Sequence, residues 1–481
     1  MDCKCKQWII LLVGVILCLR IECSKESDRI LRLPGQPSSS TVSFQQFSGY
    51  ITVDDYQSRA LFYYFVEAYT DPSSKPLLLW LDGGCSSLGV GAFVEHGPFR
   101  PKGDVLIQNH FSWNNVANIL YVESPAGVGF SFSQNATFYT TVNDTITAQD
   151  NLVFLERWFE KFPEYKNRDF FISGESYAGH YVPQLATLIL RSKLNIFNLK
   201  AIAIGNPLLE FYTDFNARGE YLWTHGLISD STYKLLNKVC NISEITRQSI
   251  LHNVSTSCSF VDNLVSKEYS EFINLYSVNL DVCISSTLSQ AAPNNFGILH
   301  SSSSSSLPSK RTPRTTLPKY SEESGKIDVC IADEVNSYLN REDVQKALHA
   351  HLLGGLSNWS FCSFVLKYDK KNLLIPTIDT LGSLVHSGIR VLVYSGDEDA
   401  VIPLIGSRRL VNKLAKSLGL NTTLPYSPWF YNHQVGGWVE TYGEKKILSF
   451  ATVRGGAHQA PYTAPQRSLT LITAFLQGTN P

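Results

Sequence analysis

The chain has 481 residues, a formal net charge of −1 at pH 7 and 17% charged residues. It is long enough to bury a large core, and its near-neutral charge does not suggest nucleic acid or a membrane surface as a partner. The charged fraction is below the roughly 25% typical of soluble domains, which indicates a compact globule.

Residues 1–23 have the pattern of a secretory signal peptide. Lys4 and Lys6 form a basic start, the run from Trp8 to Leu19 is apolar, and cleavage after Cys23 would leave a small residue at the site. The run is too short to span a bilayer, and no later stretch is apolar for about 18 residues. An uncleaved N-terminal anchor is the alternative. We therefore expect the chain to enter the secretory pathway.

The cysteines outside this segment indicate disulfides. They are Cys85, Cys240, Cys258, Cys283, Cys330 and Cys362. Their even number fits three bridges in an oxidising compartment, although the sequence leaves the pairing open. No two of them have the C-x-x-C spacing of a zinc site. N-x-S/T sites permit glycosylation at Asn135, Asn143, Asn241, Asn253, Asn358 and Asn421.

The first part of the mature chain alternates predicted strands and helices. β-rich runs at 49–53 and 60–66 predict a hairpin near a sheet edge. Continuous apolar runs at 76–81 and 118–122 are typical of strands covered on both faces. Residues 147–162 have the apolar spacing of a helix. This alternation indicates a parallel sheet with helices on both faces.

A third apolar strand leads into a tight turn that contains a serine. Residues 170–172 run through the turn 174–179, GESYAG, into a helical run at 184–190. The order strand, turn, helix is what a nucleophile elbow requires, because a small residue two places before the serine lets the chain turn sharply. A Ser176 that only caps the helix is the alternative.

A long polar region interrupts the strand pattern. The apolar run at 199–204 is followed by residues 210–340, which contain four of the six cysteines and no comparable strand. The serine tract 301–306 and the basic residues after it cannot bury enough apolar surface to order themselves. We therefore expect an insertion with a disordered, protease-sensitive linker. The predicted organisation is a signal at 1–23, a core in two parts at 24–209 and 341–481, an insertion at 210–340, and a linker at about 287–325.

Two further predicted strands, 390–394 and 448–453, end close to Asp399 and His458. In open parallel sheets the reactive site lies beyond the carboxyl ends of the strands, and Ser176 also follows such an end. The order Ser, Asp, His is that of the α/β-hydrolases. We assign Ser176 as nucleophile, His458 as general acid and base, and Asp399 as the group that orients the imidazole. Taken singly, each has a structural alternative, such as a helix cap.

Acyl transfer also needs donors for the oxyanion. The backbone N–H of Tyr177, directly after the nucleophile, is one candidate. The other is Gly84 in the Gly83-Gly84 turn, because glycine allows close backbone approach. An ordinary loop is the alternative for this turn.

A series of segments together resembles the plant serine carboxypeptidases: LWLDGGCSS, NILYVESPAGVGFS, GESYAGHYVPQLA, AIAIGNPLL, LNREDVQKALHA, YSGDEDAVIPLIGS, QVGGW and VRGGAHQAPY. The resemblance is to the type whose linker is excised to leave two disulfide-linked chains. It implies an α/β-hydrolase fold with a mostly parallel central sheet and a helical, disulfide-bearing insertion. It also implies release of C-terminal amino acids from peptides at acidic pH, without a metal or organic cofactor.

The same resemblance implies particular residue roles. The disulfides would be Cys85–Cys362, Cys240–Cys258 and Cys283–Cys330. Glu175, with Asp82 and Gly83 of the glycine turn, would bind the free carboxylate of the substrate. A buried Glu beside another carboxylate is protonated at low pH and donates a hydrogen bond, which accounts for an acidic working pH. The expected partners are peptide or protein C-termini, with a homodimer left open, in an extracellular or vacuolar location and without nucleic acid or membrane contact.

The glycine turn departs from the family pattern W-L-N-G-G-P-G-C-S-S. Pro-Gly is missing between Gly84 and Cys85, and Asp82 stands in place of the asparagine. Losing one oxyanion donor typically lowers the rate by about 10² to 10³. Three hypotheses therefore stand: an acid serine carboxypeptidase, a homologue whose catalysis is impaired by the short loop, and an acyltransferase that uses glucose esters. Such acyltransferases carry Asp and Ser where this chain has Glu175 and Ala178, which disfavours the third.

Overall fold

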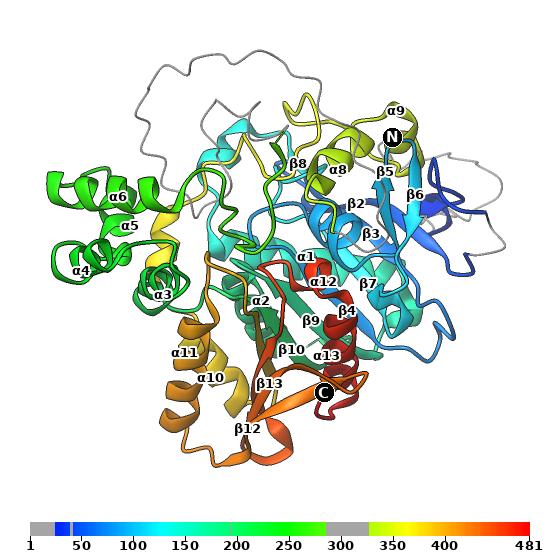
Figure 1. The fold of residues 1–481 in the computed structure, drawn as a ribbon. Helices are drawn as coiled ribbons and strands as arrows, with labels where there is room; N and C mark the ends of the chain where they lie inside the picture. The colour runs from blue at the N-terminus through cyan, green and yellow to red at the C-terminus, as the bar shows by residue number, and fades with distance from the viewer. Residues whose placement is uncertain (1–24, 39–41, 193, 285–326) are drawn as a thin grey trace, which may run out of the picture.

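The computed structural model describes residues 25–38, 42–192, 194–284 and 327–481 (Figure 1). The predicted signal at 1–23 and the predicted linker at about 287–325 lie outside the described residues. Within the described ranges, no helix combines the length and the apolar character needed to cross a membrane.

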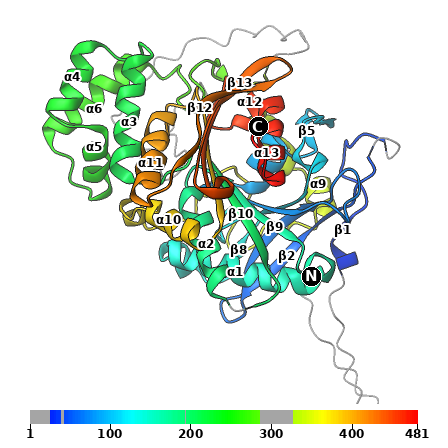
Figure 2. The same cartoon turned by 90° about the horizontal axis from the view of Figure 1, so that it is seen from below.

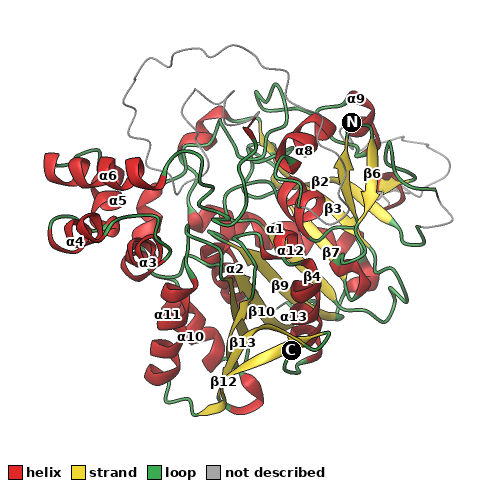
Figure 3. Cartoon of the chain, in the orientation of Figure 1, coloured by secondary structure: helices red, strands yellow, loops and turns green. Residues whose placement is uncertain are grey.

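One large mixed sheet runs through the molecule (Figure 3). Its strand order is β1-β2-β3-β7-β4-β9-β10-β11-β14-β13-β12, with β8 paired to β3. The central strands from β7 to β14 are parallel, and the outer strands on both sides are antiparallel. The strands are β1 Arg29–Ile30, β2 Gln46–Asp54, β3 Arg59–Val66, β4 Leu77–Leu81, β7 Asn118–Val122, β8 Phe132–Ser133, β9 Asp169–Glu175, β10 Asn198–Gly205, β11 Arg390–Gly396, β12 Thr422–Tyr431, β13 Gln434–Tyr442 and β14 Leu448–Val453, with β5 Phe99–Lys102 and β6 Val105–Gln108 in a separate small sheet.

The apolar runs of the sequence form the buried centre of the sheet. Every residue of β4 and β7 is buried, as predicted for strands that helices cover on both faces. The predicted hairpin is confirmed as β2 and β3, which pair antiparallel. The hairpin β12–β13 was not predicted from the sequence, because most residues of β12 are exposed and neither strand has a continuous apolar run.

Helices pack on both faces of the sheet, and Figure 2 shows the two groups on opposite sides. One face carries α1 Asp144–Lys161, α2 Ala178–Arg191, α10 Ile378–His386 and α11 Leu404–Ser417. The other carries the π-helical segment η2 Ser87–Glu95 with α8 Ile331–Leu339, α9 Glu342–Ala347, α12 Ala460–Thr463 and α13 Pro465–Gln477. Short 3₁₀ turns are η1 Lys25–Asp28, η3 Trp113–Asn115, η4 Ala136–Thr140, η5 Pro163–Tyr165, η6 Lys370–Leu374 and η7 Glu444–Lys446.

Helix α2 begins earlier than the apolar pattern predicts, directly after the serine turn, and contains Pro183 in its interior. A proline has no N–H to donate to the carbonyl four residues back. That carbonyl, Gly179 O, instead accepts a hydrogen bond from Thr377 Oγ1 at 2.8 Å. The side chain of another segment therefore satisfies the acceptor that Pro183 leaves open.

The insertion forms a helical lobe that stands beside the sheet (Figure 1). Its helices are α3 Phe211–Thr224, α4 Asp230–Lys238, α5 Ile242–Ile250 and α6 Thr256–Tyr269, and α3 packs against α11. Helix α8 does not join this lobe, although we expected the insertion to extend to residue 340. It packs on η2 and β5, because Val335 and Leu339 are buried in the core cluster on that face of the sheet.

Candidate active site

Ser176 lies on a strained turn between β9 and α2. Its φ is 60°, a left-handed conformation that residues other than glycine adopt only when the surroundings enforce it. The turn is held from both sides: Ser176 N donates to Gly205 O at 3.0 Å, and Ser176 O accepts from Gly179 N and Leu208 N, each at 3.0 Å. The backbone therefore has the geometry of a nucleophile elbow.

Asp399 and His458 form a buried pair at the ends of β11 and β14. His458 Nδ1 lies 2.7 Å from Asp399 Oδ2, and the two residues are 3% and 0% exposed. Asp399 Oδ1 also accepts from Val401 N at 2.7 Å. Because an ionised carboxylate only accepts, the proton of the neutral imidazole belongs on Nδ1 and Nε2 presents a lone pair. His458 Nε2 is buried and has no hydrogen-bond partner among the described residues, which leaves it open for a proton from a hydroxyl.

Three carboxyl groups gather beside the elbow. Asp82, Glu95 and Glu175 are buried, and one carboxylate oxygen of each lies within 4.8 Å of those of the others. Burial raises the pKa of Glu175 well above its usual value, and the charges of Glu95 and Asp82 raise it further. Burial and the charge of Asp82 also raise the pKa of Glu95, although Glu175 and Arg100 oppose the shift. Burial raises the pKa of Asp82 to about 7, although the Cys85 N–H and His458 oppose the shift. At acidic pH these carboxyls are therefore neutral hydrogen-bond donors.

Glu95 was not among the residues predicted from the sequence. Glu95 is the last residue of η2. Strand β4 and the turn that follows it bring the start of η2 to the carboxyl edge of the sheet. An acidic residue in an apolar helical stretch, LGVGAFVEHG, was the available signal. Both carboxylate oxygens of Glu95 and Oε2 of Glu175 are buried without a hydrogen-bond partner among the described residues. A divalent cation would need ionised carboxylates, whereas burial favours the neutral form, so the cluster suits a hydrogen-bonding ligand.

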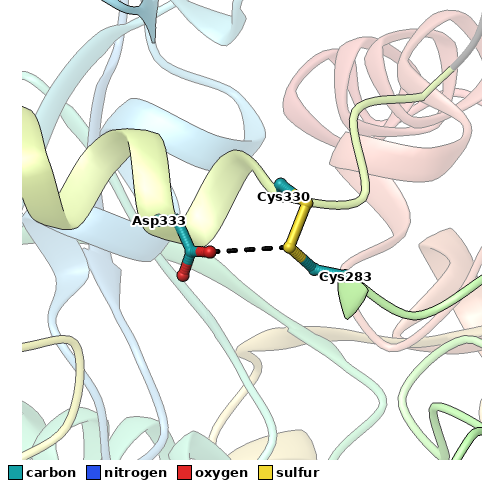
Figure 4. A group of neighbouring side chains, drawn as sticks. All are labelled: Cys283, Cys330 and Asp333. Atoms are coloured by element: carbon teal, nitrogen blue, oxygen red, sulfur yellow. Dashed lines mark hydrogen bonds between the residues drawn. A yellow bond between two sulfur atoms is a disulfide. The ribbon is translucent and has the colours of Figure 1, made fainter. Parts of the chain in front are cut away.

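The described residues contain a second group of potential metal ligands. Figure 4 shows Cys283, Cys330 and Asp333 with a bond between the two sulfur atoms. Asp333 Oδ2 is 3.5 Å from Cys283 Sγ. Sulfurs in a disulfide are not thiolates and do not serve as metal ligands. The described residues also contain the disulfides Cys85–Cys362 and Cys240–Cys258, so the pairing is the one implied by the family resemblance.

The shortened glycine turn packs directly on the elbow. The Gly84 N–H donates to Asp82 O at 3.1 Å, and the Cys85 N–H donates to Asp82 Oδ1 at 3.1 Å. The Gly84 hydrogen is therefore directed into its own turn, although we expected it to face the oxyanion. A Cβ on Gly83 would lie 2.1 Å from Tyr177 N, so nothing larger than hydrogen fits between these two residues.

The insertion reaches the catalytic loops through its last described segment. Leu275 O accepts from Ala400 N at 2.9 Å, and Tyr276 O accepts from His458 N at 2.8 Å. The Tyr276 ring also stands edge-on to the imidazole, with centroids 5.0 Å apart. The lobe thus fixes the backbone next to both Asp399 and His458, a role that the polar sequence did not reveal.

The parallel sheet covered on both faces and the serine on its strand-to-helix turn define the class of the molecule as an α/β-hydrolase. Residues 34–478 match the model of the family described as serine carboxypeptidase. The chain belongs to the serine carboxypeptidase family, and the activity type that the family supports is that of a carboxypeptidase-type hydrolase.

Two plant relatives are similar over nearly the full length. The chain is 54% identical to serine carboxypeptidase-like 45 of Arabidopsis thaliana, covering 98% of this chain and 98% of that one. It is 53% identical to serine carboxypeptidase-like 46 of the same organism, over 98% of this chain and 96% of that one. Among solved structures, Kex1(delta)p, a prohormone-processing carboxypeptidase from Saccharomyces cerevisiae, has a TM-score of 0.71 at 22% identity, covering 95% of this chain and 96% of that chain. The match to Kex1(delta)p supports the same fold.

Proposed function

We propose that this protein is a serine-type carboxypeptidase that releases the C-terminal residue of peptides at acidic pH. The observation that carries the proposal is the cluster of Asp82, Glu95 and Glu175, whose raised pKa values keep it neutral in acid. Glu175 directly precedes Ser176 in the chain. A substrate carboxylate held by the cluster would therefore place the last peptide bond at the serine, which accounts for exopeptidase rather than endopeptidase action.

The catalytic groups then act in the order expected of a serine hydrolase. Ser176 Oγ attacks the carbonyl carbon of the last peptide bond while His458 Nε2 accepts its proton. The Tyr177 N–H stabilises the oxyanion of the tetrahedral intermediate. His458 returns the proton to the leaving amine, and the free C-terminal amino acid departs from an acyl-enzyme. Water, deprotonated by His458, hydrolyses the ester and restores Ser176.

A second candidate function is that of a secreted homologue with impaired catalysis. The orientation of the Gly84 N–H favours this second candidate, because the group donates a hydrogen bond to Asp82 O within the shortened turn and not to an oxyanion. An acyl-transfer site with one oxyanion donor in place of two is slower by about 10² to 10³. The two candidates therefore differ in the rate of wild-type turnover and not in the residues involved.

One experiment separates these candidates. We expect the wild type to release the last residue of a free-carboxylate peptide at about pH 5 at least about tenfold faster than at about pH 8, because Asp82, whose pKa burial raises to about 7, ionises between them. Ser176→Ala should be inactive, and a C-terminally amidated peptide should be cleaved poorly at both pH values. Wild-type and Ser176→Ala rates that are equal at every pH would contradict the first candidate.

Insertion of Pro-Gly between Gly84 and Cys85 tests the second candidate. A gain of about 10² to 10³ in turnover over a barely active wild type would identify an impaired homologue. No gain would count against it. Product formation from an acyl-glucose, without release of amino acids from peptides, would instead identify an acyltransferase.

We also propose that the protein matures in the secretory pathway. Disulfides form in oxidising compartments, and the described residues contain three of them. The side chains available for glycosylation are partly or fully exposed at Asn135, Asn143, Asn241, Asn253, Asn358 and Asn421.

A further inference from the structure

Asn206 lies directly after β10, at the carboxyl edge of the sheet, and is fully buried. Its Nδ2 donates to Asp399 Oδ2 at 2.8 Å. The same oxygen faces His458 Nδ1 at 2.7 Å. Asn206 and His458 are the side chains that hydrogen-bond Asp399 within the described parts of the chain, and the remaining donors are the backbone N–H groups of Val401 and Ile402.

The amide of Asn206 is held in one orientation. Its Oδ1 accepts from Gly396 N at 3.1 Å. Since a backbone N–H only donates, this contact requires the oxygen on that side and the NH₂ group on the side of Asp399. The Asn206 N–H also donates to Tyr394 O at 2.8 Å, and its φ is 39°. Neighbouring strand β11 therefore fixes both the backbone and the side chain of Asn206.

We propose that Asn206 is a positioning residue of the catalytic site, which holds the carboxylate of Asp399 in the rotation that His458 requires. This inference rests on the proposed function. The amide is a neutral donor, so it orients the carboxylate without adding a charge next to His458. Without it, Oδ2 would keep only His458 and the longer contact from Ile402 N at 3.3 Å. The carboxylate could then rotate away from the imidazole.

The electrostatic surroundings of this carboxylate come from several elements. The charged and titratable groups that face it are His458 after β14, Glu175 at the end of β9, Arg218 and Tyr221 on α3, and Tyr276 of the insertion. Arg218 is anchored by its Nη2, which donates to Val401 O at 2.9 Å. None of these groups changes in the variants described next.

Two substitutions of Asn206 give different predicted pH profiles. Asn206→Leu removes the donor, so kcat for the acylation step should fall about 10- to 100-fold at every pH, the value of one hydrogen bond to a charged group. Asn206→Asp preserves the shape of the side chain. When protonated, its hydroxyl can donate to Asp399 while its carbonyl accepts from Gly396 N. Burial and the Asp399 charge raise the pKa of the new carboxyl, so this variant should stay within a few-fold of wild type at about pH 5, and its rate relative to wild type should fall as the pH rises.

The measurement combines two readouts over about pH 5 to pH 8. The first is kcat and KM on a free-carboxylate peptide, where we expect kcat to change and KM to stay constant. The second is the rate at which an alkyl fluorophosphonate inactivates the enzyme by phosphonylating Ser176 with loss of fluoride, which needs His458 but no peptide substrate. Asn118→Asp and Asn118→Leu are matched controls. Asn118 is also fully buried, but its amide bonds backbone at the start of β7, at the opposite edge of the sheet.

The outcomes are separable. The inference is overturned if Asn206→Leu reacts with the phosphonylating reagent as fast as wild type, or if the Asp and Leu variants lose the same factor at every pH. It is also overturned if the Asn118 variants reproduce the same kinetic losses. A wild type that is phosphonylated but releases no amino acid would contradict the proposed function alone. The recovery of Asn206→Asp at low pH in phosphonylation would then still support the positioning role.

Discussion

Burial sets the charge of the carboxyl groups that face the nucleophile. Glu175 is 2% exposed and Asp82 is 5% exposed, and burial is the largest cause of the raised pKa of both. A neutral carboxyl donates to a substrate carboxylate, whereas an ionised one repels it. Binding by this cluster should therefore weaken as the pH rises, and the loss should appear in KM for substrates that carry a free carboxylate.

The variant Glu175→Gln tests this reasoning. Its amide donates at every pH, so we predict that the rise of KM for a free-carboxylate peptide with increasing pH is smaller than in the wild type, by about tenfold or more. Activity at about pH 5 should fall only a few-fold. Steady-state kinetics on paired free and amidated peptides provide the measurement and its control. An unchanged dependence of KM on pH would show that Glu175 does not contact the substrate carboxylate.

At the scale of elements, the glycine turn depends on a tether to a distant segment. Cys85 is bonded to Cys362, and Ser86 N donates to Phe361 O at 2.7 Å. The two cysteines are 277 residues apart in sequence. The turn that carries Asp82 is therefore held in place both by its packing on the elbow and from the other half of the core.

We predict that the double variant Cys85→Ser, Cys362→Ser loses about 2 to 5 kcal/mol of stability and also loses activity, mostly through a higher KM. The matched control is Cys240→Ser, Cys258→Ser, which removes a bridge of only 18 residues in the insertion lobe. It should destabilise the lobe while KM stays near the wild-type value. Urea unfolding and kinetics on the same preparations make the comparison. Equal changes of KM in both double variants would argue against a specific role of the tether.

At the scale of the whole molecule, several buried carboxyls make the folded state take up protons. Burial raises the pKa of Asp82, Glu123 and Asp214 to about 7 in each case. In the unfolded chain these groups ionise near their ordinary values, so between those values and about pH 7 the folded state binds more protons. Stability is then fully present in acid and is lost as the pH rises toward neutrality. These three groups thus make the folded state more stable in acid than at neutral pH.

We predict that the melting temperature falls from about pH 4.5 to about pH 7.5, by on the order of 5 °C. Glu123→Gln should make this fall smaller, since Glu123 accepts from Ser86 Oγ and Phe130 N away from the nucleophile and glutamine has the same shape without an ionisable group. Differential scanning calorimetry of both proteins across this pH range makes the test. A melting temperature that rises with pH in the wild type would contradict the direction.

Local patterns in the sequence predicted the central strands of the sheet and the order of the candidate catalytic residues. The strands β4, β7 and β14 are apolar runs that are read locally, and the turns with Ser176 and His458 follow strand ends directly. Such signals are recognisable in the sequence because each depends on a few neighbouring residues.

The way in which the groups of the site meet depends on tertiary packing. Glu95 joins Asp82 and Glu175 through the packing of η2. Asn206 and Asp399 are hydrogen-bonded although they are 193 residues apart in the sequence. The direction of the Gly84 N–H and the packing of α8 on the core were likewise absent from the pattern. The physical reason is that pKa values and hydrogen-bond partners depend on burial and on neighbours that are distant in the chain. Composition and periodicity record neither of these.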